Sequence, residues 1–205
     1  MKTKNLDLNR AYTFSNFFEL KIEAKDLAQE FGYTLERKWL QLPQFQGELD
    51  RIQETQSRIT EILPYVSLGN ETARREFMIS PIMHDLIHYA KIEIRIEYKL
   101  KVTEQLQGVF DYLLQSPNYV IVVEAKKEDL DFGMTQLVAE LIALDQWLDD
   151  FPQTSILGAV TTGRIWQFAR LDRQTKHLEQ GLENYQIPEQ FDPVLRILMQ
   201  AVTTN

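Results

Sequence analysis

The feature that most constrains the fold of this chain is a run of five β-favouring residues, Tyr119 to Val123, which leads into Glu124-Ala125-Lys126. A strand this apolar is typical of the middle of a sheet, where both of its faces are covered. A helical pattern of apolar residues follows directly, from Asp131 to Leu148. A buried strand followed by a long apolar helix predicts a mixed α/β layer in which helices pack on a sheet.

Hydrophobic spacing elsewhere gives the order of the other elements. Apolar residues alternate with charged ones from Ile92 to Tyr98, and this alternation predicts a half-buried strand. Further strands are expected at 108–114, 155–161 and 164–170, and further helices at 14–31, 47–63, 71–89 and 193–202. We therefore expect an α/β fold with a mixed sheet of about five strands flanked by helices. An N-terminal helical segment, 1–68, is expected to precede the core domain, 69–205.

Composition excludes several classes of protein. The chain has 205 residues and no cysteine, so it has no thiolate nucleophile, cysteine–zinc site or disulfide framework. The N-terminus carries charges where a signal peptide needs its apolar stretch, and no window resembles a membrane span. We expect a cytoplasmic protein that does not contact a membrane.

The charge of the chain is unevenly placed. The net charge of −8 argues against a protein that coats nucleic acid nonspecifically. The segment from Glu128 to Pro152 carries seven acidic residues and no Lys or Arg, which is nearly the whole excess. The rest of the chain is close to neutral, so a local basic surface is still compatible with the sequence.

Three charged residues interrupt the apolar strands. Alternate residues of a strand face the same side, so Glu124 and Lys126 are expected to point together. Asp111 lies inside the preceding apolar run, and 12 residues separate it from Glu124. That separation suits a hairpin, and pairing of the two strands would bring Asp111 and Glu124 close together.

Two neighbouring carboxylates repel each other unless a cation lies between them. Their hard oxygen atoms suit Mg²⁺ or Mn²⁺, with water and a substrate phosphate completing the coordination. An ion held in this way can polarise a phosphodiester and activate a water, and Lys126 can stabilise the charge that develops or orient the water. Each of these residues alone is more often a solvated strand end. Their joint occurrence on adjacent strands is much more selective for phosphodiester hydrolysis.

The pattern Asp111-x12-Glu124-x-Lys126 resembles the signature of the PD-(D/E)XK nuclease superfamily. The stretch from Asn70 to Pro81 resembles the helix before the core in the N-terminal nuclease domains of type I restriction subunits and their stand-alone relatives. The hairpin sequence 160–168 is similar to a late hairpin of this group. The resemblance spans about 70–170 and implies a restriction-endonuclease-like fold.

The resemblance also implies roles for residues outside the signature. An early glutamate ten residues before a proline points at the metal in those relatives, which here is Glu71 before Pro81. Glu76 is the alternative, although residues five apart lie on different faces of a helix. Gln136 occupies the first position of a Gln-x-x-x-Gln/Glu element next to the site. Phe110 stands where the nominal proline of the signature would be.

The resulting expectation is a Mg²⁺- or Mn²⁺-dependent nuclease that acts on nucleic acid, DNA by analogy, in a restriction, defence or repair context. The metal ligands are Glu71, Asp111 and Glu124, and Lys126 and Gln136 complete the catalytic set. A homodimer is compatible with cleavage of both strands. The alternative is a catalytically silent nuclease-fold module for nucleic-acid binding or protein assembly. A purely structural α/β protein is a third interpretation.

Overall fold

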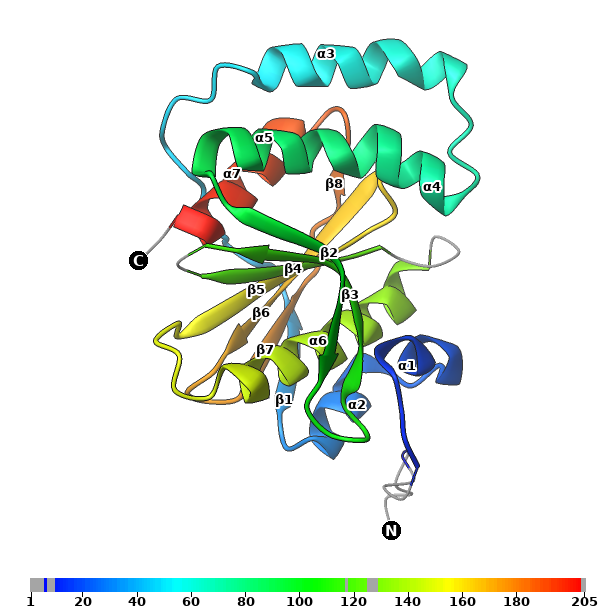
Figure 1. The fold of residues 1–205 in the computed structure, drawn as a ribbon, viewed down its shortest axis with the longest axis vertical. Helices are drawn as coiled ribbons and strands as arrows, with labels where there is room; N and C mark the ends of the chain where they lie inside the picture. The colour runs from blue at the N-terminus through cyan, green and yellow to red at the C-terminus, as the bar shows by residue number, and fades with distance from the viewer. Residues whose placement is uncertain (1–5, 7–9, 117, 125–128, 204–205) are drawn as a thin grey trace.

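The computed structural model describes residue 6 and residues 10–116, 118–124 and 129–203, with the backbone alone for 120–124. Within these residues the chain forms an eight-stranded mixed sheet with helices on both faces (Figure 1). The strands are β1 (Thr34–Lys38), β2 (Glu93–Lys101), β3 (Gln107–Gln115), β4 (Tyr119–Glu124), β5 (Ser155–Thr161), β6 (Ile165–Asp172), β7 (His177–Gly181) and β8 (Tyr185–Gln186). The α/β class expected from the sequence is confirmed.

The order of strands is β1-β7-β6-β5-β4-β3-β2, and β8 pairs with β6 outside this path. The strand β4 is therefore central, as its apolar sequence predicts. It is antiparallel to β3 on one side and parallel to β5 on the other. A parallel neighbour needs a crossover connection, and the long helix α6 (Leu130–Leu148) lies in the connection between β4 and β5.

The two faces of the sheet are covered by different helices (Figure 1). On one face α6 packs between the sheet and the N-terminal helices α1 (Phe14–Leu20) and α2 (Ala24–Glu30). On the other face lie α3 (Ile52–Ile62), α5 (Ser80–Ala90) and α7 (Phe191–Thr203). None of the helices in the described part of the chain is both long and apolar enough to cross a bilayer.

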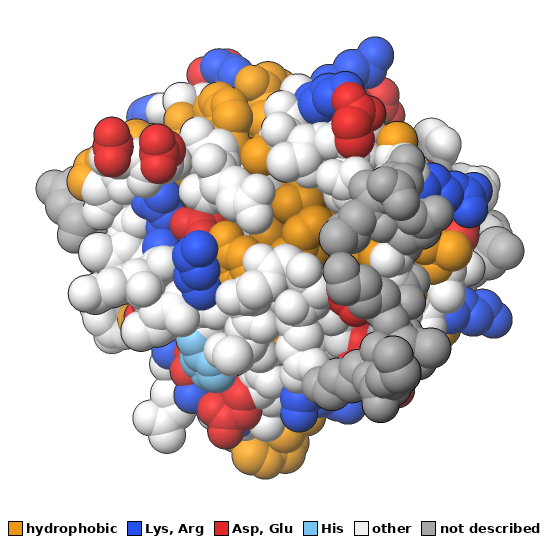
Figure 2. Space-filling model, turned by 90° about the horizontal axis from the view of Figure 1, so that it is seen from below, with side chains coloured by type: hydrophobic (Ala, Val, Ile, Leu, Met, Phe, Trp, Pro, Cys, Tyr) orange, Lys and Arg blue, Asp and Glu red, His pale blue; other side chains and the backbone are white. Residues whose placement is uncertain are grey.

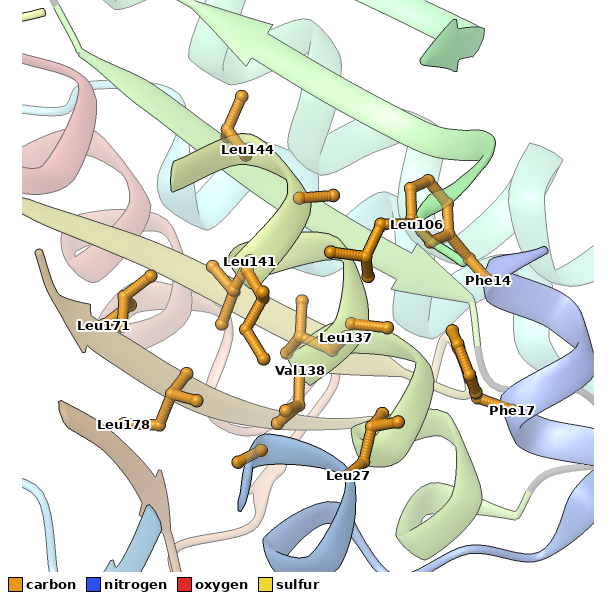
Figure 3. Packing of buried hydrophobic residues seen from close by; sticks show 14 of the residues in the cluster. Phe14, Phe17, Leu27, Leu106, Leu137, Val138, Leu141, Leu144, Leu171 and Leu178 are labelled. Carbon is orange, nitrogen blue, oxygen red and sulfur yellow. The ribbon is translucent and has the colours of Figure 1, made fainter. Parts of the chain in front are cut away.

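Most residues of α6 are buried, because apolar side chains extend round most of the surface of this helix. Figure 3 shows Leu137 and Leu141 of α6 among leucines of β6 and β7 and the side chains of α1 and α2. At Gly158 of β5, a Cβ atom would lie 2.6 Å from Leu137 Cδ1. The glycine therefore allows α6 to approach the sheet closely, and each leucine buried there contributes roughly 1.5–3 kcal/mol.

A continuous helical segment from Glu71 to Ala90 crosses the opposite face. It comprises α4 (Glu71–Arg74), the π-helical turn η2 (Arg75–Ile79) and α5. Asn70 caps it as expected, since its side-chain oxygen accepts a hydrogen bond from Ala73 N at 2.8 Å. Pro81, the second residue of α5, has no N–H to donate to the preceding turn, and the irregular turn η2 ends two residues before it. The expected helix at 71–89 is confirmed.

The N-terminal third differs from its sequence-based prediction. The helix expected at 14–31 is two short helices, which a left-handed residue, Lys21 (φ 53°), separates. No strand is expected at Thr34–Lys38, yet these residues form β1, which pairs in parallel with β7 at the edge of the sheet. The segment is thus not purely helical. The helix expected at 47–63 begins at Ile52, followed by the 3₁₀ turn η1 (Leu63–Tyr65).

A buried ion pair fixes the C-terminal end of α6. Arg173 donates from Nε to Asp145 Oδ1 at 2.7 Å, and Tyr33 donates to the other oxygen of Asp145 at 2.7 Å. The guanidinium also donates to the carbonyl oxygens of Phe151 at 2.6 Å and Gln153 at 2.8 Å. These bonds connect α6 to the loop that leads into β5.

Removal of this guanidinium is expected to destabilise the fold. Because Arg173→Met leaves the Asp145 carboxylate buried without its counter-ion, the free energy of unfolding should fall by about 3–5 kcal/mol. Denaturant unfolding monitored by circular dichroism measures the loss. Arg37→Met is the matched control, because Arg37 is exposed. Equal stability of the two variants would show that the network contributes little.

Candidate functional site

The backbone brings Asp111 and Glu124 to the same end of neighbouring strands. The antiparallel register pairs Tyr112 with Val122. Asp111 lies one residue beyond this pair on β3, and Glu124 lies two residues beyond it on β4. The expected pairing of the two strands is confirmed. The side chain of Glu124 and the whole of Lys126 lie outside the described residues, so the convergence of the three groups stays a prediction.

The neighbouring end of β5 lies beside Glu124 and is rigidly folded. The backbone of Glu124 pairs with Thr161, a fully buried residue whose hydroxyl donates to Ile165 O at 2.9 Å. The same hydroxyl accepts from Gly163 N at 2.8 Å. Gly163 has φ +83°, and a Cβ there would lie 3.1 Å from Met78 Cβ. The turn after β5 therefore lies directly against η2.

Arg75 of η2 forms ion pairs with three carboxylates. Its Nη2 lies 3.0 Å from Asp111 Oδ1 and 3.1 Å from Glu71 Oε1. Its Nη1 lies 3.2 Å from Glu97 Oε1. The three acids come from β3, α4 and β2 respectively. Two residues that the sequence predicts as metal ligands, Glu71 and Asp111, thus contact the same cationic group.

Local backbone geometry places the partners of Arg75. Glu71 begins α4 and lies four residues before Arg75, so the two side chains are neighbours on one helical face. Glu97 adopts a left-handed conformation with φ 54° in the middle of β2, which is costly for a residue with a side chain. Glu71 and its alternative, Glu76, are both exposed, so burial does not separate them. Glu71 lies 3.1 Å from the same Nη2 of Arg75 that contacts Asp111, and this shared contact favours Glu71 as the residue of this helix near Asp111.

A second polar pair lies on α6, close enough to Asp111 for its charge to act on one member. Gln136 and Glu140 are both buried, and Gln136 Nε2 donates to Glu140 Oε1 at 2.9 Å. Oε2 of Glu140 has no hydrogen-bond partner among the described residues. Burial raises the pKa of the Glu140 carboxyl well above its ordinary value of 4.5, and the negative charge of Asp111 raises that pKa further. The hydrogen bond from Gln136 opposes this shift.

The start of α6 is capped by an acidic residue close in sequence to Lys126. Asp129 Oδ1 accepts a hydrogen bond from Phe132 N at 3.2 Å. Its negative charge therefore lies at the positive end of the helix dipole, where it is stabilising. The acidic residues at this point need no bound cation to account for them.

The described side chains do not by themselves form a metal site. Within the part of the chain that the structure covers, no group of three or more His, Asp or Glu side chains is arranged to hold an ion. Glu71, Glu97 and Asp111 are held around the guanidinium of Arg75 instead. A metal centre here would need the carboxylate of Glu124 and a change in the contacts of Arg75.

Sequence reasoning did not identify two of the residues around Asp111, because Arg75 and Glu97 were not expected to contribute to the site. Glu140 is the last residue of the Gln-x-x-x-Gln/Glu element that begins at Gln136, but no separate role was expected for it. The i, i+4 spacing of Glu71 and Arg75 could have indicated that they pair, since opposite charges at this spacing attract on a helix. Glu97 reads from the sequence as the solvated face of a strand, and nothing in its neighbours predicts its left-handed backbone.

The raised pKa of Glu140 predicts a pH-dependent effect of Glu140→Gln. The folded state holds the proton more tightly than the unfolded chain, so ionisation above pH 4.5 costs stability. That loss is at most about 1.4 kcal/mol per pH unit until the folded state also ionises. Because glutamine cannot ionise, the variant should gain stability relative to the wild type as the pH rises.

Urea denaturation from about pH 4 to about pH 8 measures this gain, with the exposed Glu76→Gln as the matched control. We expect the difference between Glu140→Gln and the wild type to grow in favour of the variant with pH. A difference that stays constant over this range would contradict a carboxyl whose pKa is raised by burial.

Comparison with known proteins adds nothing to the assignment of the site. A scan against protein-family models found no match, and a search of curated proteins found none. Among solved structures, the cryo-EM structure of the DrdV–DNA complex matches with a TM-score of 0.43 and 13% identity. The match covers 78% of this chain but only 14% of that chain. A likeness this distant assigns neither an activity nor a substrate.

Proposed function

We propose that this chain is a metal-dependent nuclease that hydrolyses phosphodiester bonds, of DNA, in a restriction, defence or repair context. The observation that carries the proposal is the pairing of β3 with β4, which brings Asp111 and Glu124 to one end of adjacent strands. The motif Glu124-Ala125-Lys126 begins in the sequence at Glu124, the last residue of β4. The resemblance of these residues to the PD-(D/E)XK signature supports the same function.

The residues at this end of the sheet fit a hard divalent cation. The carboxylates of Glu71 and Asp111 already lie within 3.1 Å of one positively charged group. Carboxylate oxygens are the ligands that Mg²⁺ and Mn²⁺ prefer. Glu71, Asp111 and Glu124 would hold the ion. A bound ion would polarise the phosphodiester and activate a water for attack.

The other residues have separate roles. The ammonium group of Lys126 stabilises the negative charge that develops on the phosphate oxygens, or orients the attacking water. Gln136 is a positioning residue, because its amide donates to Glu140, which is electrostatically coupled to Asp111.

The surface supports local rather than general binding of nucleic acid. On the face drawn in Figure 2, Lys and Arg side chains are interspersed with Asp and Glu and do not gather into one broad patch. A net charge of −8 also disfavours nonspecific coating of a polyanion. The substrate is therefore expected to be held mainly near the site, by the ion, Lys126 and nearby arginines.

The activity is tested by incubation of the protein with supercoiled plasmid and short duplexes in Mg²⁺ or Mn²⁺. We expect Lys126→Ala to reduce the rate roughly 100- to 1,000-fold, the usual cost of removing one group that stabilises a transition-state charge. Lys127→Ala is the matched control, since it removes the same charge one residue outside the motif. Absence of cleavage by the wild type with either metal would favour the silent module instead.

Metal binding tests the ligand set independently of catalysis. Isothermal titration of the wild type with Mn²⁺ should give a dissociation constant in the millimolar range or tighter. Glu124→Ala should abolish binding because it removes a ligand, whereas Glu76→Ala should retain it because Glu76 is not one of the three proposed ligands. Equal binding by Glu124→Ala and the wild type would exclude Glu124 as a ligand.

A further inference from the structure

One guanidinium serves three acidic side chains beside the proposed metal site. Arg75 lies within 3.2 Å of carboxylate oxygens of Glu71, Glu97 and Asp111. Its Cζ also lies 5.7 Å from the ring centroid of Tyr112. The side chain of Arg75 is 20% exposed and that of Asp111 is 19% exposed. The cluster is thus partly shielded from water, where charge interactions are stronger than at an open surface.

This arrangement places Arg75 in competition with a metal ion. Three carboxylates repel one another, and one nearby cation relieves the repulsion. A divalent ion bound by Glu71 and Asp111 would use oxygen atoms of the same carboxylates that Arg75 now contacts. A guanidinium is also more weakly hydrated than an ammonium group and adapts readily to other oxyanions. The guanidinium of Arg75 is therefore suited to neutralise the three carboxylates without a metal, and to bind another anion once a metal has taken its place.

We infer that Arg75 is an internal counter-cation of the site, which gives up Glu71 and Asp111 when a divalent ion binds and then contacts the substrate phosphate. This inference rests on the proposed nuclease function. Nη2 now contacts both Glu71 and Asp111, and it is this nitrogen that loses its carboxylate contacts when the ion binds. A forked guanidinium binds phosphate oxygens with two parallel hydrogen bonds.

The position of Arg75 on the backbone is consistent with such a change. Arg75 begins the π-helical turn η2, a type of turn that is frequent at functional sites. Its third partner, Glu97, is mostly exposed, with 68% of its side chain accessible. Glu97 is not one of the proposed metal ligands, so its ion pair with Arg75 does not have to break when the other two contacts are lost.

The decisive experiment compares Mn²⁺ affinity in the full chain by isothermal titration. Arg75→Met removes the competing cation, so the dissociation constant for Mn²⁺ should fall about tenfold, a shift typical of a charge removed at close range. Arg95→Met is the matched control, because Arg95 also lies on this part of the sheet but pairs with Glu93 at 2.9 Å. The control should leave the dissociation constant unchanged.

A second variant covers the case in which Arg75→Met does not fold, as judged by circular dichroism. Arg75→Lys keeps the positive charge but not the fork that spans several carboxylates. Its dissociation constant for Mn²⁺ should also fall, by less than in Arg75→Met. A constant that is unchanged or higher in the folded variant would overturn the inference and leave Arg75 a structural residue.

The phosphate contact requires a measurement of DNA affinity. In the Lys126→Ala background with saturating Mn²⁺, Arg75→Met should weaken binding of a short duplex about tenfold. It should also reduce the slope of log affinity against log salt concentration by about the value expected for one phosphate contact. Arg95→Met should change neither. Tighter Mn²⁺ binding without this loss of DNA affinity would overturn the assignment of the phosphate contact.

Asp111→Asn separates failure of this inference from failure of the proposed function. If the wild type and Asp111→Asn bind Mn²⁺ equally, or neither binds it, the nuclease proposal fails regardless of Arg75. If only the wild type binds and Arg75→Met gives no gain, the nuclease proposal stands and the role of Arg75 fails.

Discussion

The pairing of β4 with β3 and β5 is the constraint on which the candidate site depends. Antiparallel pairing with β3 sets Asp111 and Glu124 at one end of the ladder, and parallel pairing with β5 sets Thr161 beside Glu124. The helix α6 packs over this ladder through Leu137 at Gly158. The apolar core therefore determines where the charged groups lie, and the same contacts that stabilise the fold also position the chemistry.

Among the described residues, acidic side chains gather at this end of the sheet. Arg75 forms ion pairs with Glu71, Glu97 and Asp111, while burial raises the pKa of Glu140 on α6. Such an arrangement costs stability unless a cation is added. Functional sites commonly retain groups that are unfavourable for the fold alone. The ion pairs of Arg75 account for the described carboxylates, and the proposed cation site would require those pairs to change.

Much of the fold can be predicted from periodicity, and the exceptions have physical causes. The strands β2 to β6 and the helix α6 follow from regular apolar spacing and from the run Tyr119 to Val123. The strand β1 could not be predicted in this way, because Leu35 is its one buried residue and pairing with β7 alone defines it. The break at Lys21 likewise depends on how α1 and α2 pack on α6.

The candidate site is predictable in part for the same reason. The hairpin-length gap between Asp111 and Glu124 indicates that their strands are neighbours. The contacts of Arg75 depend instead on the position of η2 over the sheet and on the left-handed backbone of Glu97. Tertiary packing sets both, and short-range sequence patterns do not encode them.

Anomalous scattering from Mn²⁺ in crystals of the protein tests the central claim most directly. The account predicts a single strong peak bounded by the carboxylates of Asp111 and Glu124, with the guanidinium of Arg75 moved away from Asp111. A peak elsewhere on the molecule, or carboxylates that point to opposite faces of the sheet with no metal between them, would contradict it.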